Sequence, residues 1–314
     1  MAVTRAQVAL NPIQWINLKA CAGGEPVWLL SDPAWRLEQS KVHRLIRRAG
    51  FTAVMMEVLD TQTLQNYRRM LDSVGLRPAP GFLQISPPEA KGLSFPRGSA
   101  EWVRWFNPVR RRAEETNFLG LDTVFLAAEL EKPAPRFRQA CAVGANFDQS
   151  LLDRQLECLV EAAEILRAEG IRPGLHNHVG TLIETEFEID YTLGQIDAAL
   201  LGASPDIGHL EWAGVDCVRF LGKYRDRLVD VHIKDLDLKI AAASRATPTP
   251  YEEVADQEFF LEPGLGQIDL QGAVAALGDN FDGWLIIEVD KTSKEPFESA
   301  KTSWKWVERT FPPA

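Results

Sequence analysis

Short runs of β-branched and apolar residues alternate along the chain with longer stretches in which apolar residues recur at helical spacing. This alternation is typical of parallel strands joined by crossover helices. Eight runs are predicted to be strands: 7–10, 52–58, 77–82, 123–128, 172–176, 204–207, 228–233 and 284–289. Eight stretches are predicted to be helices: 34–49, 63–74, 99–117, 151–169, 185–200, 215–227, 270–277 and 296–308.

Several predicted helices end on a glycine directly before the next strand, as in RRAGFTAV, DSVGLRP and RAEGIRPGL. Glycine accepts the left-handed conformation of a helix C-cap. Eight such units in 314 residues favour an α/β fold of the (β/α)8, or TIM barrel, class. A doubly wound sheet would typically carry a glycine-rich phosphate loop after its first strand, and no G-x-G-x-x-G or P-loop sequence is present.

A single domain over residues 1–314 is therefore expected. Two long insertions interrupt the pattern, at about 81–98 and at 236–266. Both follow predicted strands, and the loops after the strands form the active-site face of a barrel. We expect these insertions to act as lids or pocket walls.

Composition excludes several classes of partner. The net charge of -10 and the isoelectric point near 5.1 argue against a nucleic-acid partner, which would require a basic surface. No apolar stretch approaches the length of a membrane span, and the N-terminal residues lack the features of a signal peptide, so a cytoplasmic protein with no membrane partner is expected. The cysteines show no metal or disulfide spacing and are expected to be reduced: Cys21, Cys141, Cys158 and Cys217.

Four of the five histidines lie at the ends of apolar runs. His176 and His178 occur in GLHNHVG, His209 in PDIGHLEWAG and His232 in LVDVHIKD. A further run, WLIIEVD, ends on Glu288. Because the carboxyl ends of barrel strands meet at one face, these residues together predict a divalent-metal site assembled from several strands.

Asp206 and His232 are candidate ligands with ordinary structural alternatives. Asp206 follows the sixth predicted strand, where a metal would neutralise its carboxylate, although it could equally cap the next helical turn. Alternation places Asp230, His232 and Lys234 on the polar face of the seventh strand. A lone strand histidine is more often a core residue than a ligand, but its neighbour Lys234 and the strand of Asp206 favour a site.

Two other strand ends could complete the metal shell. The fourth strand ends with Glu129 and Glu131, and the fifth ends with His176 and His178 on one face. The residues alone leave open which pair supplies the remaining ligand.

Some residues near these strands have a structural interpretation. The sequence T-E-F-E forms a capping box that opens the fifth helix, so Glu186 and Glu188 are expected to be structural. Trp15, Trp28 and Trp212 are expected in loops at the rim, where indole rings suit stacking on a sugar, and packing is the alternative.

The motifs HNHVGTLIETEFEID, PDIGHLEWAGVD, LVDVHIKDLD, PGLGQIDLQGAVAAL and FDGWLIIEVD together resemble the xylose-isomerase-like TIM barrels that act on sugars. The similarity extends from NPIQW near the N-terminus to the last strand. It is greatest to the inosose (2-keto-myo-inositol) dehydratases and the related catalytic subunits of C-glycoside deglycosidases. The resemblance implies a divalent metal, Mn²⁺ first, with Co²⁺ or Mg²⁺ as alternatives.

The resemblance also implies roles for individual residues. Asp206, His232 and Glu288 would be metal ligands from strands six, seven and eight. Ketose epimerases have a glutamate at the end of strand five, where this chain has His176, so Glu129 is chosen as fourth ligand and His176 remains the alternative.

The remaining candidates would handle the substrate. His176 and His178 would carry out acid/base steps, because the pKa of histidine lies near neutral pH. Lys234 would stabilise an enediolate, with a salt bridge to Asp235 or Asp237 as the structural alternative. The residues expected to contact the substrate are Trp15, His209 and Trp212.

The predicted function is a metal-dependent lyase that eliminates a group next to the ketone of a sugar or cyclitol. A ketose 3-epimerase or sugar isomerase is the alternative within the same fold, and a non-catalytic sugar-binding barrel is the alternative of another class. The resemblance implies a homo-oligomer for a dehydratase and a complex with a small second subunit for a deglycosidase.

Overall fold

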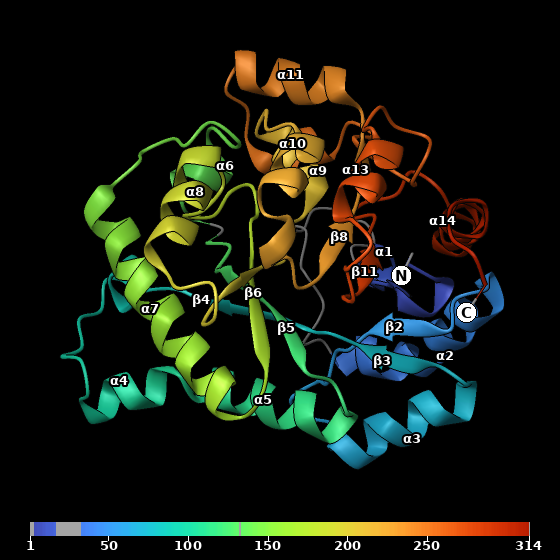
Figure 1. Cartoon of the computed structure of the whole chain (residues 1–314), viewed down its shortest axis with the longest axis horizontal. Helices are drawn as coiled ribbons and strands as arrows, with labels where there is room; N and C mark the ends of the chain where they lie inside the picture. The colour runs from blue at the N-terminus through green and yellow to red at the C-terminus, as the bar shows by residue number, and fades with distance from the viewer. Residues whose placement is uncertain (1–2, 17–32, 132, 314) are drawn as a thin grey trace.

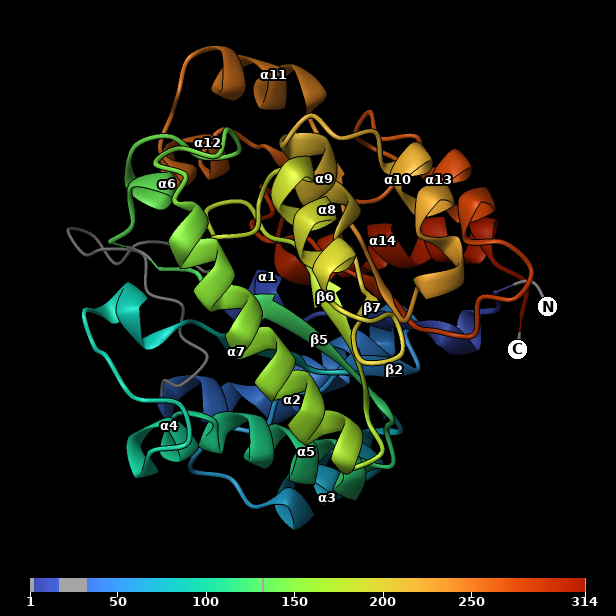
Figure 2. The same cartoon turned by 60° about the vertical axis from the view of Figure 1, so that its left-hand side comes forward.

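A computed structural model of the chain describes residues 3–16, 33–131 and 133–313. Parallel strands run through its middle and helices lie outside them (Figures 1 and 2). The parallel strands are β1 (Val8–Leu10), β2 (Ala53–Met55), β3 (Arg77–Ala79), β4 (Phe82–Ile85), β5 (Thr123–Ala128), β6 (Arg172–His176), β7 (Gly202–Ala203), β8 (Val231–Ile233) and β11 (Leu285–Ile287).

The strands close into a barrel from two parallel sheets, with the orders β3-β2-β1-β11-β8 and β4-β5-β6-β7. On one side β3 and β4 join the sheets, because they form one strand interrupted only at residues 80–81. On the other side two parallel bridges, Ala203 with Leu228 and Asp206 with His232, join β7 to β8. The predicted (β/α)8 barrel is confirmed.

Helices cover the outside of the barrel, where they pack on one another in neighbouring pairs such as α2 with α14 and α10 with α13. One helix follows each strand of the barrel: α2 (Pro33–Ala49), α3 (Leu64–Val74), α5 (Asn107–Leu119), α7 (Gln149–Ala168), α8 (Glu186–Gln195), α10 (Cys217–Lys223), α13 (Leu270–Leu277) and α14 (Pro296–Thr310). Gly75 after α3 has φ 70°, in the left-handed region, as the sequence predicts for a C-cap.

Additional elements lie between these units. They are α1 (Ile13–Ile16), α4 (Ala100–Trp105), α6 (Pro135–Arg138), α9 (Ile207–Trp212), α11 (Leu238–Ala246), α12 (Tyr251–Ala255), the antiparallel strands β9 (Asp235–Leu236) and β10 (Phe260–Leu261), and 3-10 turns at Arg5–Gln7, Pro88–Lys91 and Arg225–Arg227. In both cartoons α11 lies at the opposite end of the molecule from α3 (Figures 1 and 2).

The structure differs from the predicted pattern at two prolines. The helix predicted over 99–117 is two helices, α4 and α5, that meet at Phe106, and Pro108 lies in the first turn of the second. The sixth strand ends at Ala203 rather than at residue 207. Pro205 has no N–H to donate to the ladder, and Asp206 keeps a single bridge with His232 while its side chain caps α9.

The two predicted insertions are built differently. Part of the first, Phe82–Ile85, is β4, the second half of the third barrel strand. The second holds α11, α12 and β10, and Asp235 anchors its return to the barrel. The Asp235 carboxylate accepts hydrogen bonds from the backbone N–H groups of Gly264 and Gly266, both at 2.9 Å, and from Ile268 at 3.1 Å.

The inside of the barrel holds a small apolar cluster that supports the polar residues beyond it. Its members are Ala9, Ala53, Met55, Ala79, Phe125 and Ile286. The Phe125 ring lies edge-on to two histidine rings, with centroids 4.3 Å from His232 and 5.6 Å from His176. The cluster therefore forms an apolar floor beneath the ends of β6 and β8.

The two ends of the described chain lie side by side (Figures 1 and 2). Arg5 donates from its backbone N–H to Pro312 O at 3.0 Å and from Nε to Phe311 O at 2.9 Å. None of the described helices combines the length and apolar composition that crossing a membrane requires. That residues 1–314 form a single domain stays a prediction, since 17–32 lie outside the described residues.

Asp230 is a buried carboxyl at the start of β8. Its Oδ1 accepts a hydrogen bond from Trp284 N at 2.7 Å, and its own N–H donates to Ser204 Oγ at 3.2 Å. Burial raises the pKa of Asp230 to about 6, against the opposing hydrogen bond from Trp284. Between the unfolded pKa of about 4 and pH 6 the folded chain therefore holds a proton that the unfolded chain has lost.

We expect Asp230→Asn to stabilise the fold at neutral pH and to have no effect near pH 4. Stability that depends on protonated Asp230 is lost as pH rises through about 6, whereas the asparagine keeps the acceptor for Trp284 and never ionises. The gain at pH 7.5 should reach about 2 to 3 kcal/mol in urea unfolding. Asp282→Asn, which changes a 76% exposed carboxylate, is the control and should follow wild type. If the free energies of unfolding of wild type and D230N differed by the same amount at every pH between 4 and 7.5, the raised pKa of Asp230 would be contradicted.

Candidate active site

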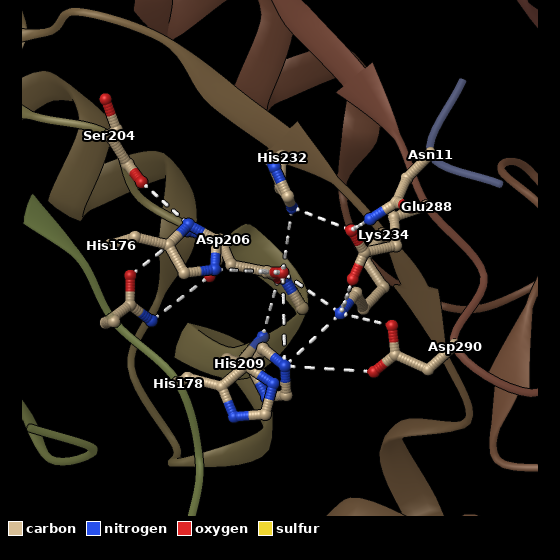
Figure 3. A network of polar contacts seen from close by, with 12 residues as sticks. Asn11, His176, His178, Ser204, Asp206, His209, His232, Lys234, Glu288 and Asp290 are labelled. Atoms are coloured by element: carbon tan, nitrogen blue, oxygen red, sulfur yellow. Dashed lines mark hydrogen bonds and ion pairs between the residues drawn. The ribbon is translucent and has the colours of Figure 1, made fainter. Parts of the chain in front are cut away.

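The ends of four strands bring the predicted ligands together (Figure 3). His176 is the last residue of β6, His232 lies in β8, Asp206 comes three residues after the end of β7, and Glu288 directly follows β11. Ligand atoms of His176, Asp206 and His232 all lie within 4.8 Å of one another. The structure therefore assembles one carboxylate and two imidazoles from three strands, with Glu288 beside them.

The two oxygens of Asp206 have different surroundings. Oδ1 accepts hydrogen bonds from the N–H groups of Gly208 at 2.9 Å and His209 at 3.1 Å, which makes Asp206 the N-cap of α9. Oδ2 points to the site, 3.7 Å from His232 Nδ1 and 4.0 Å from His176 Nε2. The two interpretations of Asp206 from the sequence are thus compatible, because each uses a different oxygen.

His232 and Glu288 form a close buried pair. Glu288 Oε2 lies 3.0 Å from His232 Nδ1 and accepts a hydrogen bond from the side-chain amide of Asn11, directly after β1. Burial alone would lower the pKa of His232, but the charges of Glu288 and Asp206 outweigh it and raise the pKa to about 9. Both carboxylates in turn have pKa values held well below their usual range by Lys234 and the neighbouring histidines, despite burial.

Lys234 is completely buried among carboxylates. Its Nζ lies 3.0 Å from Asp206 Oδ2, 2.9 Å from Glu288 Oε1 and 2.8 Å from Asp290 Oδ1. The sequence alternative, a salt bridge to Asp235 or Asp237, is wrong, because these three carboxylates are its ion-pair partners. Burial opposes the charged form, yet the carboxylates raise the pKa of Lys234 well above its usual value.

His176 and His178 are held by backbone carbonyls. His176 Nδ1 lies 3.1 Å from Ser204 O and His178 Nδ1 lies 2.7 Å from Val179 O, so in each ring the proton belongs on Nδ1 and the lone pair on Nε2. Burial lowers the pKa of both rings, that of His178 to about 4. Both imidazoles are therefore neutral near pH 7 and able to bind a metal or accept a proton.

A second polar group adjoins the first. Ligand atoms of His178, His209 and Asp290 also lie within 4.8 Å of one another, and the rings of the two histidines are 3.8 Å apart. Lys234 Nζ lies 3.2 Å from His209 Nε2, so an ammonium already occupies part of this group. Burial and the charge of Glu288 raise the pKa of Asp290 well above its usual value, although the charge of Lys234 opposes the shift.

A cavity of about 410 Å³ opens beside the first group. Its walls combine the polar groups at the ends of the strands with apolar side chains, as small-molecule sites do. The lining residues are Asn11, Pro12, Ile13, Met55, Met56, Glu57, Phe82, Gln84, Arg112, Leu130, His176, His178, His232 and Glu288.

The structure does not bring Glu129 to the assembled ligands. Glu129 Oε1 pairs with Lys91 Nζ at 2.8 Å, and Ser86 Oγ lies 3.0 Å from both Glu129 Oε2 and Glu131 Oε1. The Glu129 side chain is 32% exposed, unlike the completely buried Asp206. Of the two candidates for fourth ligand, His176 is the one that the structure places beside Asp206 and His232.

The expected substrate contacts also lie apart from the cavity. Trp212 is completely buried and donates from Nε1 to Ser244 Oγ at 3.0 Å, and His209 lies between its ring and that of His178. Trp15 is buried on α1 and is absent from the described cavity lining, as are Trp212 and His209. Packing accounts for both tryptophans. Trp28 lies outside the described residues.

The loop after β6, which carries His178, is fixed by buried charges. Glu184 accepts hydrogen bonds from the N–H groups of Gly180 at 2.7 Å and Gly144 at 2.8 Å. Glu188 closes the predicted capping box with Thr185 and pairs with buried Arg136 at 2.6 Å. The structural role predicted for Glu188 is confirmed, and Glu186 pairs with Arg219 on the surface.

Sequence reasoning missed three polar groups of the site region. Asn11 follows β1, and Asp290 stands two residues after Glu288, where strand alternation could have indicated a shared face. Glu57 lines the cavity two residues after the end of β2. Each lies within three residues of the end of a short strand, which was the available signal.

The comparisons with known proteins agree with this architecture. A family model described as xylose isomerase-like TIM barrel matches residues 43–310. The inosose dehydratase of Geobacillus kaustophilus (strain HTA426) is 32% identical over 322 aligned positions, which cover 96% of this chain and 94% of the relative.

Two solved structures share the fold at low identity. A xylose isomerase-like TIM barrel protein from Mycobacterium smegmatis, solved in complex with magnesium, has a TM-score of 0.67 at 16% identity and covers 98% of both chains. A D-allulose 3-epimerase from Methylomonas sp., in complex with D-allulose, has a TM-score of 0.65 at 15% identity and covers 99% of both chains.

We expect Lys234→Met to destabilise the chelator-treated protein by about 3 to 5 kcal/mol, because it removes the buried cation from three carboxyl groups. Lys223→Met is the matched control, since Lys223 pairs with Asp190 on the surface at 43% side-chain exposure and should cost less than about 1 kcal/mol. Urea unfolding at pH 7.5 measures both values. An equal decrease in the free energy of unfolding of the two variants would show that the buried ion pairs of Lys234 stabilise the fold no more than a surface pair does.

Proposed function

We propose that this chain, which belongs to the xylose isomerase-like TIM barrel family, is a divalent-metal-dependent lyase. Its substrate would be a keto-cyclitol or keto-sugar, from which it eliminates a group in the position β to the ketone. The observation that carries the proposal is the buried group of His176, Asp206 and His232 at the end of a cavity large enough for one sugar ring. The inosose dehydratase relative supports this substrate class.

The described residues fit a divalent cation. Asp206 Oδ2 and both ring nitrogens of His232 are buried and make no hydrogen bond of ordinary geometry with the described residues, although their charges are close. Orphaned donor and acceptor atoms are what a metal would satisfy. Mixed carboxylate and imidazole ligands suit Mn²⁺, the first expectation, as well as Co²⁺ or Mg²⁺. The ligands would be His176, Asp206, His232 and Glu288.

When bound, the metal would supply Lewis-acid polarisation of the substrate ketone. The chain's own residues would do the rest. His178, neutral and with its Nε2 lone pair available, would accept the proton from the carbon next to the ketone. Lys234 would act as a positioning residue that keeps Asp206 and Glu288 ionised and in place, because it is buried behind them and absent from the described cavity lining.

A ketose 3-epimerase is the second candidate, favoured by the structural likeness to the D-allulose 3-epimerase. It would share the deprotonation and then return a proton to the opposite face of the same carbon. His176 at the end of β6, where ketose epimerases have glutamate, favours the lyase. A homo-oligomer or a complex with a small second subunit, a cytoplasmic location and a non-catalytic alternative remain predictions.

The ligand set predicts a contrast between two carboxylates. Asp206→Asn should weaken Mn²⁺ binding by more than about 100-fold, since asparagine keeps the α9 cap but removes the anionic oxygen. Glu129→Gln should bind Mn²⁺ as wild type does, because Glu129 pairs with Lys91 away from the group. Metal analysis by mass spectrometry and Mn²⁺ titration measure both. If E129Q lost the metal and D206N retained it, Glu129 rather than Asp206 would be the ligand.

The lyase and epimerase proposals differ in their products. In D₂O the Mn²⁺-loaded protein should convert inosose or a 3-keto-glucoside to an unsaturated ketone or a released aglycone, followed by NMR. His178→Gln should slow this turnover by about 100-fold or more while Mn²⁺ content stays constant. A mixture of deuterated epimers without any elimination product, for both substrates, would establish the epimerase instead.

A further inference from the structure

The cavity has a second polar wall that the proposed metal chemistry does not use. Two carboxyl groups line the cavity as a whole: Glu288, one of the proposed ligands, and Glu57, which follows β2. Around the barrel, β1, β11 and β8 separate β2 from β7 on one side, and the β3–β4 strand, β5 and β6 separate them on the other. Glu57 therefore leaves the barrel diametrically opposite the strand that Asp206 follows.

Glu57 is held firmly by its backbone. Its N–H donates to Tyr67 Oη of α3 at 3.0 Å, and its carbonyl accepts from Gln39 Nε2 of α2 at 3.0 Å. Two helices thus fix the main chain, and Glu57 lines the cavity with its carboxyl group near Trp35 and Arg112. A group presented in this way is placed for contact with a bound molecule.

Arg112 reaches the same wall from α5. Its Nη1 pairs with Glu115 Oε2 at 2.9 Å, and the interruption of the third strand makes room for it. A Cβ on Gly81 would lie 3.1 Å from Arg112 Nη1 and 2.8 Å from Met56 Cε, so a side chain at this break would press on both. The wall opposite the ligands therefore holds one guanidinium and one carboxyl group among Met55, Phe82 and Gln84.

Burial favours the protonated form of Glu57. It raises the pKa of Glu57 to about 8, although the charge of Arg112 and a hydrogen bond with the Trp35 side chain oppose the shift. Buried ionisable groups on the packed helices include Tyr67 on α3, Glu115 on α5 and His43 on α2, whose ring meets Tyr67 edge-on. A carboxylic acid that keeps its proton near neutral pH can donate it, as general acids in enzymes do.

We propose that Glu57 is the general acid that protonates the leaving group, facing the metal ligands across the cavity. This inference rests on the proposed lyase function. His178 takes the proton from the carbon next to the ketone, and that electron pair becomes the new carbon–carbon double bond. The bond from the β carbon to its oxygen breaks, and the oxygen takes the proton of Glu57 and departs as water. Solvent then returns a proton to Glu57, and His178 releases its own.

The leaving group decides how much this acid matters. Hydroxide is a poor leaving group and requires a proton, whereas fluoride departs with much less help. In Glu57→Gln the amide keeps the size of the carboxyl group and stays neutral, so the fold should tolerate it. Elimination of water from inosose should fall by about 100-fold or more, but loss of fluoride from inosose fluorinated at the leaving position should fall less than about 5-fold.

Deuterium exchange separates this role from damage to the site. In D₂O, E57Q should still place deuterium on the carbon next to the ketone at a rate near wild-type turnover, because His178 and the metal ligands are unchanged. Glu57→Asp, with a carboxyl group one carbon shorter, should recover part of the water elimination. Asp60→Asn, an exposed carboxylate further along the same segment, is the control and should match wild type throughout.

Each other outcome overturns the inference. Wild-type rates of water elimination in E57Q would exclude Glu57 as the acid while leaving the lyase function standing. Equal loss of exchange, water elimination and fluoride elimination in E57Q would mean a structural role. A Mn²⁺-loaded wild-type protein that neither exchanges deuterium nor eliminates from these ketones would overturn both the lyase proposal and this one.

Discussion

The buried carboxyl groups at the mouth of the barrel determine the charge that the side chains around them must carry. Asp206, Glu288 and Asp290 are each at most 5% exposed, and a carboxylate removed from water is costly unless opposite charge or a proton balances it. Lys234 and the protonated His232 balance Asp206 and Glu288, while burial raises the pKa of Asp290 and so favours its neutral form. Charge neutrality is therefore achieved inside the protein by three neighbouring strand ends and their loops.

The same balance links metal binding to pH. In the proposed holoenzyme His232 must be neutral to bind an ion, yet its pKa of about 9 means that it carries a proton at neutral pH. An arriving cation takes over the neutralising role of that proton, which leaves to solvent. Affinity should then weaken as pH falls below about 9, and Lys234 keeps the carboxylates ionised in either state.

The sequence predicted the barrel because its helices and strands are punctuated locally, by glycine caps and by apolar runs. It predicted Asp206, His232 and Glu288 because each stands at a strand end, which topology alone brings to one face. It could not rank Glu129 against His176, since that depends on a turn that lets Lys91 and Ser86 hold Glu129. Trp212 was misjudged and Glu57 was missed for a related reason. Whether a side chain beyond a strand end is buried or faces the cavity depends on the loops, whose sequences have no hydrophobic periodicity.

The two sheets of the barrel differ in how far along the chain their partners lie. Strands β4 to β7 pair with their successors, whereas β1 pairs with β11, and the hydrogen bond from Asn11 to Glu288 joins residues 277 positions apart. Long-range pairing is slow because a large loop must close before the contact stabilises it. During synthesis the β4–β7 sheet is complete and β1 has β2 on one edge, while its other edge still lacks β11. The site therefore matures last, and a ribosome-bound chain short of β11 exposes an unpaired strand edge that chaperones would need to protect.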